Sequence, residues 1–311
     1  MKVVLARVRR SPLEKVSNAT GLRPASTGCA CAPLAKAARR KKKRGSPEYL
    51  KWLEKALKPL AKDLHKFLKA EAVRVAKWLS SEIHHEKLRK AELPHIKVSV
   101  ADVERILKQL DLSGWVALIG VIEPELLSAF KENAKAGFQV IGFDPSEEIV
   151  NLVNEQASTW AAERAAGLVG MRRNPDGTLV ENPNAAYAIT ETTRDELRGL
   201  TADAIDEGWS VDTFTSELLD SFAFSEERAT TIARTELAFA HVEGNLTAWD
   251  ESGVVEQKQS ILCSEHDLDD TCNDNADEGP IPLDAEFQSG HQGPPYHPNC
   301  VCDVVPVLSE Q

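Results

Sequence analysis

The C-terminal region of the sequence contains most of the side chains that could do metal chemistry. Four of the six cysteines lie there, and His291 is a further histidine in reserve. The candidate ligands are Cys263, His266, Cys272, His297, Cys300 and Cys302. Cysteine and histidine are the ligands that zinc prefers, and four of them can enclose the ion as a tetrahedron with bonds of about 2.0–2.3 Å. Six candidates for four places leave the ligand set open.

The spacing of these groups gives one regular half-site and one irregular one. His297 and Cys300 are separated by two residues, as in many zinc half-sites, and three prolines between Pro294 and Pro298 restrict the backbone around them. The other half is irregular: Cys263 and His266 are separated by two residues and His266 and Cys272 by five, so the zinc pattern of two C-x2-C pairs is absent. The pattern therefore fits a structural metal, an ordered loop of polar and thiol contacts, or disulfides.

A catalytic metal would also need an open coordination position and a general base. Several carboxylates lie near the cysteines, but their number does not single out one of them as a base. The sequence contains no HExxH motif, no Walker A motif and no glycine-rich dinucleotide turn. We therefore predict no catalytic residue and no enzymatic activity.

A long amphipathic helix is predicted near the N-terminus, from Ser46 to about Lys90. Ser46 can cap its first turn, Pro47 suits the first helical position, and apolar residues then recur at helical spacing from Leu50 to Leu79. A proline at position 59 is expected to bend this helix.

The middle of the chain is predicted to be helical, with one irregular projection. Helical patterns begin at Val98 and cover residues 123–137, and a further helix is expected from Ser146 to about residue 166. Residues 138–145 are predicted to form a short strand. Residues 171–184 contain a Pro-Asp-Gly turn and are expected to form an exposed hairpin or loop.

Three closely spaced helices are predicted before the cysteine region. The first ends near Gly208, Ser210 caps the second, and the third runs from Ser225 to a stop at Gly253. The predicted fold class is mainly α, with a helical N-terminal region, a helical bundle and a small irregular α+β lobe rich in Cys and His. The predicted divisions are an arm (1–45), a helical region (46–187) and a C-terminal domain (188–311).

Charge is distributed unequally along the chain. Residues 1–44 contain 13 Lys and Arg against one acidic residue, whereas the rest contains 24 against 47. The arm has no sustained periodicity and is expected to be flexible. Its densest basic run is Arg39, Arg40, Lys41, Lys42, Lys43 and Arg44. This run could neutralise DNA phosphates, dock on an acidic surface, or simply keep the protein in solution.

Two further expectations follow from composition. The longest apolar run, Trp115 to Ile122, is far shorter than the roughly 20 residues that cross a bilayer, so no membrane span is predicted. Six cysteines in 311 residues are too few for a disulfide scaffold, which favours a reducing compartment.

The succession of three segments, Arg228–Trp249, Leu262–Gly279 and Pro294–Cys302, resembles the C-terminal domain of phage minor head proteins. This is the head-morphogenesis family typified by the Mu F protein. The resemblance covers about Thr190 to Pro306, and its most specific motifs are IARTE (232–236) and PPxHPxCxC.

The resemblance also implies a ligand set. This chain is similar to a variant of the family, with Asn275 where a second cysteine would stand. It thereby implies a structural zinc site made by His266, Cys272, His297 and Cys300, with Cys302 as a substitute ligand and Cys263 outside the set.

The IARTE motif needs its own explanation. Arg234 and Glu236 point to different faces of a helix, so they are not an obvious mutual pair. Our hypothesis is that both residues clamp the cysteine-rich loop to the helical bundle. The alternative is that they only solvate the helix.

The resemblance implies a structural and assembly protein of a tailed-phage head, present in the head interior or portal region of the virion and in the host cytoplasm during assembly. The implied partners are portal, scaffold and capsid proteins. Residues 1–44 could contact phage DNA, and the apolar stripe from Leu50 to Leu79 could face another subunit, including a second copy of the chain. The alternatives are an enzyme or toxin-like effector that carries the same domain, and a non-specific DNA-binding protein that acts through the arm.

Overall fold

The computed structural model describes residues 47–91, 100–185, 188–207, 209–263, 266 and 270–308. The predicted arm, its basic run Arg39–Arg44 and the predicted cap Ser46 lie outside the described residues. The α-helices are α2 (Pro47–Ala91), α3 (Val100–Lys108), α4 (Ile119–Val140), α5 (Glu147–Leu168), α6 (Ile189–Asp206), α7 (Val211–Leu219), α8 (Glu226–Ser252) and α9 (Thr271–Asp277). Two short 3-10 helices cover Ser113–Leu118 and Phe222–Phe224. The predicted class, mainly α with a small α+β lobe, is confirmed.

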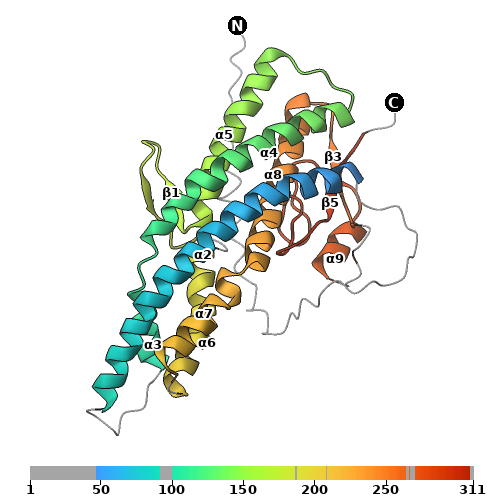
Figure 1. The fold of residues 1–311 in the computed structure, drawn as a ribbon. Helices are drawn as coiled ribbons and strands as arrows, with labels where there is room; N and C mark the ends of the chain where they lie inside the picture. Colours follow the sequence, from blue (N-terminus) through green and yellow to red (C-terminus); the bar gives the residue numbers. More distant parts are fainter. Residues whose placement is uncertain are drawn as a thin grey trace.

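The helices form an elongated body with different ends. Figure 1 shows α2, α4 and α8 running alongside one another, with α3, α6 and α7 gathered at one end and the small C-terminal lobe at the other. Helix α8 is the central element, because it packs against α2, α4 and α5. The C-terminal lobe therefore lies against the end of a helical bundle rather than apart from it.

The apolar stripe of α2 belongs to the core of this same chain. Leu60, Leu64, Leu68 and Leu79 are all at most 1% exposed, and helices α7 and α8 pack against α2. Burying each such side chain contributes roughly 1.5–3 kcal/mol relative to exposure. The prediction that this stripe faces another subunit is therefore wrong, because the chain covers it with its own helices.

The helices on both sides of the predicted boundary at residue 187 share one core. Leu64 of α2 and Leu126 of α4 belong to the same buried cluster as Leu197 of α6 and Leu237 of α8. The two regions are therefore packed as one unit.

The predicted strand over residues 138–145 is wrong. Helix α4 continues to Val140, Gly142 adopts a left-handed conformation (φ 66°), and Ser146 caps α5 by accepting a hydrogen bond from the amide of Ile149. Phe138 packs against Phe143 with ring centroids 5.6 Å apart, which closes the corner. A short apolar run cannot distinguish the end of a helix from a strand by its pattern.

Helix α4 also bears on the expectation about membranes. Together with the preceding 3-10 helix, it forms a stretch, Ser113–Val140, that is long and apolar enough to cross a membrane by length and composition. Leu126 and Phe130 of α4 are buried in the core, and α4 packs against α5 and α8. Core helices of globular proteins have the same composition.

The predicted caps Ser210 and Ser225 and the predicted stop at Gly253 are confirmed, whereas the predicted stop at Gly208 lies outside the described residues. The hydroxyl of Ser210 accepts from the amide of Thr213, and that of Ser225 accepts from the amide of Arg228, each at 3.0 Å. Helix α8 ends at Gly253, which is left-handed at φ 67°. Glycine reaches this conformation without the steric cost of a Cβ atom.

Two small sheets complete the described fold. Strands β1 (Met171–Arg173) and β2 (Leu179–Glu181) form the predicted hairpin. In the C-terminal lobe, β3 (Gln257–Ile261) lies between β4 (Ile281–Pro282) and β5 (Asp303–Val307), and both pairings are antiparallel. Ile261 at the end of β3 pairs with Asp303 at the start of β5. The register therefore brings the residues that follow β3 beside those that precede β5.

Candidate metal centre

Three segments deliver thiol and imidazole groups to one position in the C-terminal lobe. The first is the connection after β3, which contains His266, and the second is the start of α9, which contains Cys272. The third is the loop before β5, which contains His297, Cys300 and Cys302. All three cysteines are at most 2% exposed. The five donors that the sequence and the resemblance selected are therefore brought together.

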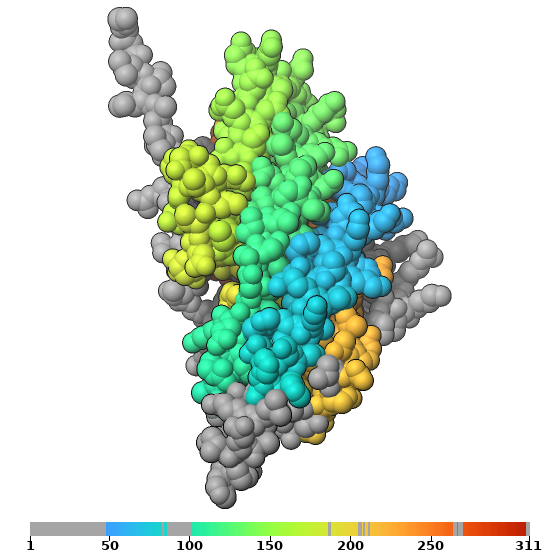
Figure 2. Space-filling model, turned by 60° about the vertical axis from the view of Figure 1, so that its left-hand side comes forward, coloured from blue at the N-terminus to red at the C-terminus, as the bar shows by residue number. Residues whose placement is uncertain are grey.

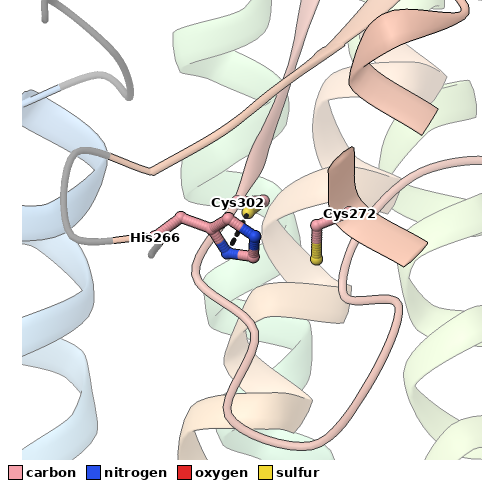
Figure 3. Close-up of side chains that lie close together, drawn as sticks. All are labelled: His266, Cys272 and Cys302. Atoms are coloured by element: carbon pink, nitrogen blue, oxygen red, sulfur yellow. Dashed lines mark hydrogen bonds between the residues drawn. The ribbon is translucent and has the colours of Figure 1, made fainter. Parts of the chain in front are cut away.

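The local structure of α9 fixes the direction of Cys272. Asp270 caps the helix by accepting from the amide of Cys272 at 2.8 Å, and Asn273 completes a capping box. The thiol then points from the first turn of α9 toward the same position as His266 and Cys302 (Figure 3).

The distances between donor atoms match those around a tetrahedral ion. The sulfur of Cys272 lies 3.3 Å from Nε2 of His297 and 3.6 Å from the sulfur of Cys300. On the other side, the sulfur of Cys302 lies 3.8 Å from Nδ1 of His266. Ligand atoms bound to zinc at tetrahedral angles are separated by about 3.3–3.8 Å, as their bond lengths require.

Two groups of donors meet at one cysteine. His266, Cys272 and Cys302 form one group and Cys272, His297 and Cys300 the other, and the donor atoms within each group lie within 4.8 Å of one another. Because Cys272 belongs to both groups, Cys302 is as much a part of the cluster as the ligands that the resemblance ranked above it.

The two histidines are oriented as metal ligands commonly are. Nδ1 of His297 donates to the carbonyl oxygen of Pro298 at 2.8 Å, which leaves Nε2 directed at Cys272. Nε2 of His266 donates to Oδ1 of Asn273 at 2.7 Å, which leaves Nδ1 directed at Cys302. A ligating histidine usually holds its second ring nitrogen in this way, because that bond fixes the tautomer and the ring orientation.

The same contacts redistribute protons among the donors. Hydrogen bonds from Cys272, Cys302 and His297 lower the pKa of Cys300 far below its ordinary value. The contact with Cys300 raises the pKa of Cys272 and raises that of His297 to about 9. These contacts favour the thiolate form of Cys300 and the protonated forms of Cys272 and His297. A divalent cation bound here would displace those protons, because metal ligands must be deprotonated.

Other candidates stay outside the two groups. Cys263 is buried in the same small core but belongs to neither of them. His291 contacts the hydroxyl of Ser289 instead. Asn275, which the resemblance aligns with a second cysteine, is fully buried and bonds to the backbone amide and the hydroxyl of Ser289. The side chain of Asn275 therefore connects α9 to the following loop by hydrogen bonds and is not a metal ligand in either group.

The two residues of the predicted clamp have different roles. Arg234 donates to Oδ1 of Asn299 in the loop at 3.1 Å, as the hypothesis requires. Glu236 instead accepts two hydrogen bonds from Arg164 of α5, at 2.6 and 2.7 Å. The expectation for Glu236 is wrong, because its side chain faces the interface between α5 and α8.

Sequence reasoning missed Asn299, the residue that accepts the hydrogen bond from Arg234. Asn299 has a left-handed backbone (φ 64°), and its side chain also donates to the hydroxyl of Thr231 at 3.1 Å. The backbone amide of Asn299 donates to the hydroxyl of Thr235. The asparagine between Pro298 and Cys300 could have predicted a left-handed turn here, because asparagine adopts the left-handed region more readily than most residues.

Sequence reasoning also missed a buried polar network beside the cluster. Nδ1 of His241 bonds to Oδ1 of Asn133 at 2.6 Å, and Nε2 bonds to Oδ1 of Asp303 at 2.9 Å. The ring also stacks on Tyr49, with centroids 4.0 Å apart. Asp303 directly follows Cys302, so the network joins the cluster to α2, α4 and α8.

Comparisons of the chain with family models, with curated proteins and with solved structures give no match. The chemistry of the centre is therefore read from its donors. Thiolate and imidazole groups select zinc and other soft or borderline metals over magnesium or calcium, which prefer oxygen. These Cys and His groups could hold a metal ion.

Proposed function

We propose that this chain is a structural assembly protein of a tailed-phage head, and that one structural zinc ion fastens its C-terminal lobe. The observation that carries the proposal is the convergence of four other donors, His266, His297, Cys300 and Cys302, on Cys272. Three of these donors belong to the motif PPxHPxCxC, on which the resemblance to phage minor head proteins depends.

The donor set supports a structural role for the ion. Zinc in structural sites has four protein ligands, whereas catalytic zinc keeps one position for water or substrate. The five donors form two groups of three that share Cys272, and their three sulfur atoms belong to buried residues. Cys272 with three of the other four donors would fill a tetrahedral shell.

The surroundings indicate what the ion would stabilise. The cluster joins the loop 294–302 to α9, and the same loop is bound to α8 through Asn299. Bound zinc would hold these segments together and so contribute directly to the folding free energy of the lobe. A lobe of fixed shape at one end of a helical body suits a protein whose function is to be recognised by portal or capsid subunits.

Metal content tests the zinc proposal. We expect one zinc per full-length chain in native mass spectrometry, and a lower melting temperature after treatment with a chelator. Alanine substitutions at the five donors, one at a time, should identify the ligands, because four variants should lose the metal and the fifth should retain it. Cys263→Ala is the matched control and should keep its zinc. A chain without metal whose melting is insensitive to chelators would refute the site.

Particle composition tests the assembly proposal separately. Quantitative mass spectrometry of purified particles from an induced lysate of the source should find a few copies per head, relative to the portal and major capsid proteins. Complete absence from both mature particles and assembly intermediates would contradict a head protein, whatever the metal content.

A further inference from the structure

One face of α2 carries a row of lysines that the proposed function does not use. The row consists of Lys51, Lys55, Lys58, Lys62, Lys66 and Lys69. The members are three or four residues apart, so the helical repeat places them on one face. All six are exposed, opposite the leucines that α2 buries in the core. Lys51 and Lys69 are 18 positions apart, so at a rise of about 1.5 Å per residue the row is about 27 Å long.

The row is not neutralised by the protein itself. Within the part of the chain that the structure describes, no ion pair includes any of the six lysines. Glu54 and Asp63, the nearest carboxylates in the sequence, are exposed beside the row without reaching it. Like charges at this spacing repel one another and destabilise a helix. Binding of a polyanion would relieve this repulsion between the lysines.

The setting of the row strengthens this argument. Residues 1–91 contain 24 Lys and Arg against 7 Asp and Glu, whereas residues 92–311 contain 13 against 41. In the sequence, only Gly45 and Ser46 lie between the basic run Arg39–Arg44 and the start of α2. Figure 2 shows α2, in blue to cyan, along the surface of the molecule with no other described segment over it. The positive charge of this acidic protein is therefore concentrated in the first 91 residues of the sequence, and the lysine row of α2 is an exposed part of it.

We propose that the lysine row of α2 binds the phosphate backbone of duplex DNA. The row is about as long as eight base pairs, since one strand carries a phosphate every 3.4 Å or so along the helix axis. Lysines act as point charges on phosphates and carry no bidentate readout of bases, so binding should be independent of sequence. This inference stands without the proposed function, because it depends only on α2.

Other polyanions fit the row less well. Single-stranded nucleic acid is usually held by aromatic side chains on which bases stack, and the row contains none. A helix that binds a membrane surface inserts its apolar face into the lipid, but the apolar face of α2 is buried in the core. Duplex DNA needs only the row of charges.

Fluorescence anisotropy with a mixed-sequence duplex of about 30 base pairs tests the proposal on the full-length chain. The variant K58Q/K62Q/K66Q removes three charges from the row, and glutamine has nearly the helix propensity of lysine. The control K108Q/K135Q/R172Q removes three charges from exposed positions on α3, α4 and β1. At about 0.1 M salt we expect the row variant to bind at least tenfold more weakly, with a salt slope smaller by about 2–3. The control should bind like the wild type.

Three outcomes would overturn the proposal. The first is a row variant with the melting temperature, affinity and salt slope of the wild type. The second is an equal loss in both variants, which would indicate net charge rather than a surface. The third is tighter binding of the wild type to phosphatidylserine vesicles or to polyglutamate than to the duplex. To distinguish the effect of the row from that of the arm, residues 39–44 are changed to glutamine. In this background the row substitutions must still weaken binding to the duplex.

Discussion

Nε2 of His241 lies 2.9 Å from Oδ1 of Asp303, so the residue that directly follows Cys302 is bound to the centre of α8. On the opposite side of the ring, Nδ1 meets Oδ1 of Asn133 in α4. The amide nitrogen of Asn133 already donates to the carbonyl of Ala129, so its oxygen must accept from His241. The candidate metal centre is thereby connected to the helical core through a buried polar network, which also includes Asn245, whose side-chain nitrogen lies 3.2 Å from Nε2.

Substitution of His241 tests this anchor. His241→Phe keeps an aromatic ring beside Tyr49 but leaves Oδ1 of Asn133 without this partner and removes one of two contacts of Oδ1 of Asp303, which also accepts from the backbone amide of Val304. We expect a loss of about 2–5 kcal/mol in the free energy of unfolding, measured by urea denaturation. His85→Phe, at an exposed position of α2, should change stability by less than about 0.5 kcal/mol. Equal effects of the two substitutions would contradict an anchoring role.

Two substitutions at Asn299 separate backbone conformation from hydrogen bonding. Asn299→Gly still allows the left-handed backbone without strain but loses the side-chain hydrogen bonds with Arg234 and Thr231. We expect this loss to lower the free energy of unfolding by about 1–2 kcal/mol. Asn299→Ala loses the same contacts and adds about 1 kcal/mol of backbone strain. Thermal denaturation should therefore rank the wild type above the glycine variant and the glycine variant above the alanine variant. A glycine variant as stable as the wild type would show that the Arg234 contact contributes nothing.

Glu243 predicts a pH dependence of stability. Burial raises its pKa to about 7 from an ordinary 4.5, against the opposing influence of Lys258 and Arg164. The folded state therefore holds this proton more tightly than the unfolded state. Glu243 therefore contributes at most about 3 kcal/mol to the free energy of unfolding. This contribution is fully present below about pH 4.5 and is lost as the pH rises through about 7.

The matched pair for this effect is Glu243→Gln and Glu155→Gln. The neutral amide at position 243 should remove the fall in stability between about pH 5 and pH 8 and make the protein more stable than the wild type at the alkaline end. The exposed Glu155 should not change the profile. Denaturation curves across this pH range decide the matter, and an unchanged slope in the position-243 variant would exclude Glu243 as the cause.

Gly244 permits the close approach of α8 to α4. A Cβ atom there would lie 2.5 Å from the carbonyl oxygen of Phe130 and 3.0 Å from the amide nitrogen of Ala134. Gly244→Ala should cost about 1–3 kcal/mol or more, because both contacts are with backbone. Gly199→Ala, where nothing lies within 4 Å, should instead stabilise α6 by about 0.5–1 kcal/mol. Calorimetric melting temperatures that move in the same direction would contradict this packing.

Much of the secondary structure was determined by local sequence. The leucine repeat of α2, the capping serines 210 and 225 and the stop at Gly253 each act within one or two helical turns, so their patterns predict the elements directly. The donor spacing of His297 and Cys300 is local in the same sense, and it indicated half of the candidate centre. The corner after α4 was mispredicted because a short apolar run carries no period of its own.

Only the tertiary structure decided which of these elements meet. The stripe of α2 faces α8 rather than a partner, Glu236 faces Arg164 rather than the loop, and His241 joins residues that lie 108 and 62 positions away in the sequence. The sequence also leaves open whether Cys302 joins the cluster, which depends on the pairing of β5 with β3. Such contacts are selected by the packing of whole helices and strands, because burial rewards the arrangement that covers all apolar faces together, and no local pattern contains that information.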